Sequence, residues 1–397
     1  MSQSTYSGRA RGKRMKVVVI GGGIIGCLTA CFLKQRGADV VVLERGQTGQ
    51  EASWAGAGIL CPIHPWLYPD SFSHLVDASL ALYPELQARL FSETGVDVEW
   101  RQTGLLIPCF DDDAAHHSAA AKAWSERRGW DMQSLDAEQS LAQEPCLNPN
   151  GLQGGLLWPD VAQVRNPRLL QATRAWMLEL GVEIIEQCEV IELLEQDGGQ
   201  NDGNMCGVKS RDGRVFEADA VLLASGSWSG ELASSMGFEL PIKPVKGQMV
   251  LIKGKVGQVR HIVKHDDAYF VPRADGRILI GASMEFVGFE RGNTDDVVGQ
   301  LLASMQRIAP SLAHCEIEQQ WMGFRPGSPD GLPFMGKVPD KKGLFVAAGH
   351  YRNGVVLAPI TAELMSRSIV GEAVDMDMSD FAVGRAMPES STIGFPD

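Results

Sequence analysis

Residues 16–45 read KVVVIGGGIIGCLTACFLKQRGADVVVLER, and this stretch decides the fold. Its β-branched start is typical of a parallel strand that is buried on both faces. A segment of helical composition runs from Ile24 to Arg36 and stops at Gly37, and a second apolar run covers Val40 to Leu43. Strand, helix and strand in this order predict a β-α-β unit that opens a doubly wound domain.

The glycines of the first turn predict a dinucleotide site. Gly21, Gly23 and Gly26 satisfy the pattern G-x-G-x-x-G, which permits a sharp turn, close approach of a pyrophosphate and tight helix packing. The first turn of the helix offers unpaired N–H groups to the phosphates. Glu44 ends the second strand, where a carboxylate would bind ribose hydroxyls and would disfavour NADP. The pattern by itself leaves NAD and FAD open.

Three later segments favour FAD. Residues 49–60 (GQEASWAGAGIL) are small and glycine-rich, which suits contact with a flat, bulky group, whereas an NAD enzyme would continue into a helix and a third strand. Residues 218–229 (ADAVLLASGSWS) predict a buried strand and a small-residue turn that returns to the same site. Residues 343–364 predict a strand, a polar turn at His350 to Gly354, and a helix whose N-terminus points at the ligand.

Composition and charge exclude several classes of protein. The 397 residues carry a net charge of −13 and are 44% apolar, which allows a sizeable core and argues against nucleic acid as the partner. No apolar run reaches the roughly 20 residues that a membrane-spanning helix needs. Eight scattered cysteines predict reduced thiols and a cytoplasmic location. Residues 1–14 predict a disordered basic tail, and His261 and His265 lack a third ligand, so we expect no metal.

Motifs along most of the chain are similar to those of a known enzyme family. They are SGSWSG from Ser225, VKGQM from Val245, YFVPR from Tyr269, GASM from Gly281, GFRPGSPDGLPFMG from Gly323 and GHYRNGVVLAP from Gly349. With GGGIIG and ER near the start, they resemble FAD-dependent amine oxidoreductases of the D-amino-acid oxidase superfamily, most closely the glycine oxidase branch. The chain lacks the YGHGG signature of eukaryotic D-amino-acid oxidases.

The resemblance implies a fold and a domain plan. The fold would be α/β (α+β overall), with a Rossmann-like FAD-binding domain and an inserted antiparallel-sheet substrate domain. The FAD-binding domain would comprise residues 15–88, 160–238 and 318–373. The substrate domain would comprise residues 89–159 and 239–317, with strands within Val98–Phe110 and Lys243–Gly281 and a helix near Asp113–Arg128. Residues 374–397 would form a C-terminal extension.

The resemblance also implies how the chain would hold FAD. We expect non-covalent binding, because no cysteine occupies a position that the family uses for covalent attachment. The turn from His350 to Val356 would meet the isoalloxazine ring. The expected cofactor residues are Gly21, Gly23, Ile24, Ile25, Gly26, Glu44, Arg45, Ala52, Ser53, Ala57, Gly58, Ile59, Val190, His350, Tyr351, Arg352, Asn353, Gly354, Val355 and Val356.

A small amino acid offers little apolar surface, so a site must bind its carboxylate, and a planar, always charged guanidinium is suited to that task. By resemblance, Arg325 pairs with the substrate carboxylate and Tyr269 is the second donor, and these two are the expected catalytic residues. Arg352 and Met284 complete the expected substrate site. Without the resemblance, a surface arginine and a core tyrosine would be the favoured interpretation. We expect Arg325 to follow a strand over Ile317–Gly323.

Two positions depart from the glycine oxidase pattern. Asp267 replaces an expected histidine, and Ile59 replaces an expected methionine near the flavin. Both changes bear on the size or charge of the preferred substrate.

The reaction implied is oxidative deamination of glycine, sarcosine or small D-amino acids by hydride transfer to FAD. Its products would be an oxo acid, ammonium and, with molecular oxygen as acceptor, hydrogen peroxide. One alternative is a D-amino-acid or glycine dehydrogenase that passes electrons to a quinone or a partner protein. Another is a flavin-bearing binding component without turnover. The resemblance also suggests a homotetramer and, in a bacterial host, supply of an imine for thiamine thiazole formation.

Overall fold

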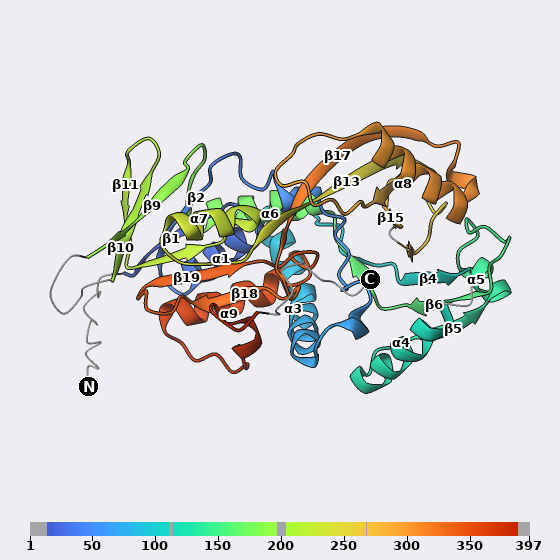
Figure 1. Cartoon of the computed structure of the whole chain (residues 1–397), viewed down its shortest axis with the longest axis horizontal. Coiled ribbons are helices and arrows are strands. Elements are labelled where there is room, and N and C mark those ends of the chain that lie inside the picture. Colours follow the sequence, from blue (N-terminus) through green and yellow to red (C-terminus); the bar gives the residue numbers. More distant parts are fainter. Residues whose placement is uncertain (1–13, 111–113, 197–203, 267, 388–397) are drawn as a thin grey trace, which may run out of the picture.

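The computed structural model describes residues 14–110, 114–196, 204–266 and 268–387, and these residues form two layered parts (Figure 1). The first part is built on a six-stranded sheet with the order β18-β19-β12-β1-β2-β8. All its strands are parallel except β18, which is antiparallel to β19. Their bounds are β1 Lys16–Ile20, β2 Asp39–Leu43, β8 Glu183–Ile185, β12 Ala220–Leu223, β18 Phe334–Lys337 and β19 Leu344–Ala348.

Side-chain alternation along β1 explains why this sheet is covered on both faces. Val17 and Val19 pack against helices on one face, whereas Val18 and Ile20 pack on the other. The helices of the first face are α1 Ile24–Gln35, α3 Asp70–Thr94, α6 Asn166–Glu179 and α9 Ala358–Val370. The second face is covered by α7 Ser229–Ser235 and a small sheet of β9 Val190–Glu195, β10 Met205–Ser210 and β11 Val215–Glu217.

The second part is built on an eight-stranded sheet with the order β17-β13-β16-β15-β14-β4-β6-β5. Neighbouring strands are antiparallel except for β14 and β4. Their bounds are β4 Leu105–Cys109, β5 Gln133–Asp136, β6 Gly154–Trp158, β13 Lys243–Lys253, β14 Ile262–His265, β15 Ala268–Pro272, β16 Arg277–Gly281 and β17 Glu316–Gly327. The associated helices are α4 Ala114–Arg128, α5 Ala137–Gln143 and α8 Asp295–Ile308 (Figure 1). Helix α8 contacts β13, β15 and β16.

The two faces of the eight-stranded sheet differ, and this difference positions the site. Val250 and Phe270 point toward α8 and pack with Leu301 in one core. The alternate residues Met249 and Tyr269 point to the opposite face, toward the first part of the molecule. A short two-stranded sheet of β3 Arg101–Gln102 and β7 Ala162–Gln163 lies between the two parts.

The structure corrects several expected boundaries. Residue 88, the expected end of the first FAD-binding segment, lies inside helix α3. The helix continues beyond it, and Leu90 packs in the same core as α1 and α9. Strand β17 starts before residue 318 and continues to Gly327, because β13 pairs with it along its whole length. Arg325 therefore lies inside a strand and not after one. Strands β5 and β6 also join this sheet, beyond the segments in which we expected its strands.

The two ends of the chain are only partly described. Residues 1–13 of the expected tail and 388–397 of the expected extension lie outside the described residues. Within the extension, Phe381 is buried in the first core and Arg385 forms an ion pair with Asp330 at 2.8 Å. In the part of the chain that the structure describes, no helix is both long and apolar enough to cross a membrane.

Candidate active site

A cavity of about 610 Å³ lies where the two parts of the molecule meet. This volume is within the roughly 300–1,000 Å³ usual for ligand sites. Of the residues that the sequence predicted for the site, all but Gly26 and Val356 line this cavity. The structure thus brings together Gly21, Gly23, Ile24, Ile25, Glu44, Arg45, Ala52, Ser53, Ala57, Gly58, Ile59, Val190, Tyr269, Met284, Arg325, His350, Tyr351, Arg352, Asn353, Gly354 and Val355.

The glycine turn after β1 packs tightly against the end of β12. Gly21 has a φ of +113°, and a Cβ atom there would lie 2.4 Å from the carbonyl oxygen of Ala224, so this position accepts only glycine. Gly26 does not line the cavity. A Cβ atom on it would lie 2.1 Å from the Gly21 carbonyl oxygen, so its role is to let helix α1 pack closely against the turn. The amide of Ile24 donates to Ser53 Oγ at 3.0 Å, which joins the start of α1 to the segment after β2.

Glu44 directly follows β2 and is hydrogen-bonded to the glycine turn. Its two carboxylate oxygens accept hydrogen bonds from the amides of Gly22 at 2.7 Å and Gly46 at 2.8 Å. Each oxygen keeps a lone pair, so the carboxylate can still accept from a pair of ribose hydroxyls. The next side chain, Arg45, lies with its guanidinium carbon 3.5 Å from the centroid of the Trp228 ring, so together they offer a flat wall beside the dinucleotide turn.

The small-residue segment after β2 is held close to the start of α6. It includes the short helix α2 (Ala52–Ala55). Gly58 has a φ of +77°, and a Cβ atom on it would lie 2.0 Å from the Val164 carbonyl oxygen. Asn166 donates from Nδ2 to the carbonyl oxygen of Ser53 at 2.8 Å. The alanines and glycines therefore leave room in the cavity and allow the chain to pass tightly behind it.

The turn after β19 is fixed from behind by buried hydrogen bonds. Tyr83 of α3 donates to the carbonyl oxygen of Val355 at 2.5 Å, and Ser79 donates to that of Val356 at 2.6 Å. Val356 itself is buried in the core between the six-stranded sheet and helices α1, α3, α6 and α9, and does not line the cavity. Helix α9 begins only at Ala358, which does not line the cavity, so the turn and not the N-terminus of that helix faces a ligand.

Burial keeps His350 neutral. Its Nε2 atom lies 3.1 Å from Thr361 Oγ1, and burial lowers the pKa of His350 to about 3. An uncharged side chain at this position adds no charge to the wall of the cavity at neutral pH.

These features fit an adenine dinucleotide of the flavin type. The turn leaves space for phosphates at the start of α1, Glu44 can accept from a ribose, and the residues of 52–59 and 350–355 line a continuous cavity long enough to include Tyr269 and Arg325. The residues that would hold FAD are therefore present and mutually placed.

Arg325 is a charged group on the wall of the cavity, close to Arg352. Its guanidinium donates to the carbonyl oxygens of Ser283 at 3.0 Å and Lys246 at 3.4 Å. Among the described residues, no carboxylate lies within ion-pair distance of it. Its pKa is lowered from the usual value, chiefly by burial, and the neighbouring Tyr269 hydroxyl opposes this shift. A half-buried guanidinium without an ion-pair partner is a natural site for a carboxylate ligand.

Tyr269 lies beside Arg325 on β15. Its hydroxyl is 3.3 Å from Met249 Sδ, and burial raises its pKa while the Arg325 guanidinium acts in the opposite direction. The hydroxyl is therefore protonated at neutral pH and can donate to a ligand. Gly281 makes the space for it, since a Cβ atom on Gly281 would lie 2.6 Å from the Tyr269 hydroxyl oxygen.

Met284 forms the rim on the remaining side. Its sulfur accepts from the hydroxyl of Tyr351 at 3.2 Å and from Nη2 of Arg352 at 3.1 Å. The four expected substrate residues thus converge on one end of the cavity. Met284 is 37% exposed, so the cavity is open to solvent at this rim. Ile59 also lines the cavity, whereas Asp267 lies outside the described residues.

Sequence reasoning missed several residues of the site. Lys264 and Met249 line the cavity from β14 and β13. Gly247 was quoted within a motif but was given no role. A glycine inside an apolar strand often marks a close approach, and this signal could have identified Gly247 and Gly281.

Comparisons with known proteins identify the family. Residues 16–368 match the family model described as FAD dependent oxidoreductase. The chain is 39% identical to a glycine oxidase of Pseudomonas putida, over 92% of this chain and 98% of that protein. It is 37% identical to the bifunctional protein ThiO/ThiG of Synechocystis sp., over 90% of this chain and 52% of that protein. The crystal structure of glycine oxidase from Geobacillus kaustophilus matches with a TM-score of 0.88 at 30% identity, over 94% of this chain and 100% of that one.

The fold, the cavity and these similarities define an FAD-dependent enzyme that oxidises amino acids or related amines. The chain belongs to the FAD dependent oxidoreductase family. The predictions of FAD as the cofactor and of a Rossmann-like domain with a second, largely antiparallel sheet are confirmed.

Proposed function

We propose that the protein oxidises glycine and other small amines, such as sarcosine and small D-amino acids, and that Arg325 binds the substrate carboxylate. The observation that carries this proposal is a half-buried guanidinium without a carboxylate partner among the described residues, on the wall of a cavity that the dinucleotide turn also lines. The similarity to glycine oxidases of Pseudomonas putida and Geobacillus kaustophilus supports the same substrate class.

The size of the substrate follows from the walls around Arg325. Tyr269, Met284 and Tyr351 bring aromatic and thioether groups close to it. We therefore expect a ligand whose carboxylate pairs with Arg325 to carry only a small group on its α-carbon. Binding energy therefore comes mainly from the carboxylate, through two charge-assisted hydrogen bonds from Arg325 and one from the Tyr269 hydroxyl.

The chain's residues act by binding and orienting. When bound, FAD supplies the acceptor for a hydride from the substrate α-carbon. Arg325 and Tyr269 fix the carboxylate, and thus determine which face of the α-carbon is presented. The substrate must bind with a neutral amine, whose lone pair then stabilises the imine product. No acidic or basic side chain is required for this step, and the neutral His350 places no competing charge nearby.

The proposal includes oxygen as the electron acceptor, with hydrogen peroxide as the product. It also includes non-covalent FAD and a homotetramer in the cytoplasm.

The state of Cys61 supports non-covalent FAD. This cysteine lines the cavity, but burial raises the pKa of its thiol to about 12, so it is not a thiolate that would attack a flavin. The similarity to ThiO/ThiG proteins favours supply of the imine for thiamine thiazole formation.

Anaerobic reduction of the purified holoenzyme tests the proposal. Glycine, sarcosine and D-alanine should each bleach the flavin absorption, and admission of air should restore it with release of peroxide. Bleaching without recovery in air would favour the dehydrogenase alternative. A flavin that stays oxidised with all three amines would refute the proposed substrate class.

A further inference from the structure

A buried arginine, Arg273, lies outside the groups used so far. It is the residue directly after β15, four positions beyond Tyr269, which lies within that strand. It is only 8% exposed. Its Nη1 atom donates to Gln163 Oε1 at 2.6 Å and to the carbonyl oxygen of Val164 at 3.0 Å, and its Nη2 atom donates to the carbonyl oxygen of Ala57 at 2.8 Å.

These partners are three neutral oxygens and no carboxylate. Burial lowers the pKa of Arg273 to about 10, so the guanidinium is still charged at neutral pH and its hydrogen bonds are charge-assisted. Gln163 is itself oriented, because its Nε2 atom donates to Thr103 Oγ1 at 3.0 Å and to the Pro272 carbonyl oxygen at 2.9 Å. Its amide oxygen is therefore directed at Arg273.

The Ala57 carbonyl belongs to the segment that lines the cavity. Ala57, Gly58 and Ile59 all lie on the cavity wall. Backbone hydrogen bonds join this segment to β7 and the chain after it: the Val164 amide donates to Gly58 at 2.9 Å and the Leu60 amide donates to Ala162 at 2.9 Å. Arg273 adds a direct link from this wall to the strand that carries Tyr269.

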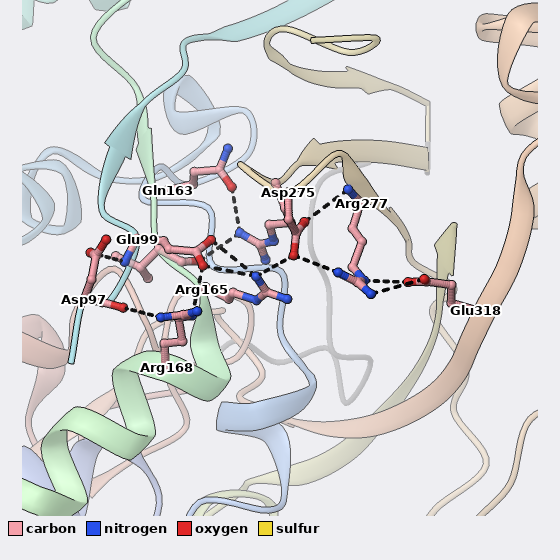
Figure 2. A network of polar contacts seen from close by, with 10 residues as sticks. Asp97, Glu99, Gln163, Arg165, Arg168, Asp275, Arg277 and Glu318 are labelled. Atoms are coloured by element: carbon pink, nitrogen blue, oxygen red, sulfur yellow. Dashed lines mark hydrogen bonds and ion pairs between the residues drawn. The ribbon is translucent and has the colours of Figure 1, made fainter. Parts of the chain in front are cut away.

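The turn that carries Arg273 is anchored by a chain of ion pairs. Figure 2 shows Asp275 between Arg165, at the start of α6, and Arg277, on β16. The distances are 3.0 Å from Arg165 to Asp275, 2.9 Å from Arg277 to Asp275, and 2.5 Å from Arg277 to Glu318 on β17. Each pair is partly exposed and weak by itself, but together they hold the turn between the two parts of the molecule.

We infer that Arg273 is a positioning residue, which sets the spacing between the Ala57–Ile59 wall and Tyr269 and thereby aligns the substrate with the flavin. This inference rests on the proposed function, because the benefit of the alignment is the oxidation step. A displacement of about 1 Å at such a site can reduce a rate by about a hundredfold. A role in stability alone would change the melting temperature and not the alignment.

The test compares holoenzyme variants with each other. In Arg273→Lys and Arg273→Met, we expect kcat with glycine to fall at least tenfold, while KM changes less than threefold because Arg325 is intact. The visible absorption bands and circular dichroism of bound FAD should also shift, since the wall beside it has moved. Arg273→Lys should keep part of the activity, because one ammonium can replace one of the three hydrogen bonds.

Two further variants keep the inference falsifiable. Arg89→Gln removes a partly exposed arginine of α3 that pairs with Glu85 and contacts neither this turn nor Ala57, so its kcat and flavin spectrum should match the original protein. Gln163→Leu keeps Arg273 and removes its orienting partner, so it should shift both readouts in the same direction and by less. Normal kcat and an unchanged flavin spectrum in folded Arg273→Lys and Gln163→Leu would overturn the inference. Failure of the unaltered protein to oxidise small amines would refute the proposed function, whereas the flavin spectrum would still report on Arg273.

Discussion

A Cβ atom built on Gly247 would lie 2.3 Å from Nη1 of Arg325 and 2.6 Å from its Cζ. Arg325 lies on β17, and its guanidinium thus packs against the backbone of the neighbouring strand β13 at Gly247. Only a glycine at position 247 leaves that space. Since Val245 pairs with Arg325 and Gly247 with Gly323, the register of two long strands creates the position of the charge.

Gly247→Ala should therefore impair substrate binding by displacing Arg325. We expect kcat/KM for glycine to fall at least tenfold with FAD content retained, because the methyl group occupies the volume of the guanidinium. Steady-state kinetics and the flavin to protein ratio measure the effect. Gly299→Ala on α8, where a Cβ atom meets nothing within 4 Å, is the matched control and should behave as the original protein. Equal kinetics in the two variants would contradict this account of Gly247.

Arg325→Ala should weaken capture of the carboxylate. Loss of a buried charge-assisted pair costs about 2–5 kcal/mol, so kcat/KM should decrease by at least tens of fold while FAD stays bound. Arg307→Ala removes an exposed arginine of α8 and serves as the control. Unchanged kinetics in Arg325→Ala would remove this residue from the site.

Tyr269→Phe should have a smaller effect of the same kind. One hydrogen bond to a ligand is worth about 1 kcal/mol, which corresponds to a roughly fivefold rise in KM for glycine. The space beside Gly281 stays filled by the ring, so the melting temperature should hardly change. A KM equal to that of the original protein would show that the hydroxyl does not contact substrate.

Activity should rise with pH until the substrate amine is neutral, because only the free base can stabilise the imine. Neither Arg325 nor Tyr269 changes charge near neutral pH: the guanidinium is protonated, and the pKa of Tyr269 is raised by burial. A profile of kcat/KM against pH between 6 and 9 measures this. A flat profile would count against reaction through the neutral amine.

The buried His350 should make the fold sensitive to acid. The unfolded chain binds a proton there below about pH 6.5, whereas in the folded chain the pKa of His350 is about 3. Stability is therefore complete above pH 6.5 and decreases as the pH falls toward 3, by at most about 1.4 kcal/mol per pH unit. His350→Gln should flatten the dependence of melting temperature on pH between 6.5 and 4, compared with the exposed control His314→Gln. The same slope in both variants would exclude His350 as the source.

The dinucleotide end of the site could be predicted because its geometry is local. Gly21 and Gly26 act within one turn of chain, and the acid of Glu44 ends the next strand, so spacing along the sequence reflects spacing in space. The resemblance supplied Arg325 and Tyr269, and the structure places both in the same cavity as the turn. The boundary of β17 was mispredicted, because pairing with β13 extends the strand through a proline-glycine pair that by itself favours a turn.

What the sequence by itself determined is the β-α-β unit, the adenine dinucleotide turn and, through its motifs, the flavin enzyme family, because those features depend on residues that are near each other in the chain. Only the tertiary structure decided that Gly247 makes room for Arg325, that Gly281 makes room for Tyr269, and that Arg273 links the strand of Tyr269 to the Ala57 carbonyl. Those contacts join distant segments across strand register and between two sheets, and no spacing along a single chain specifies which atoms meet there.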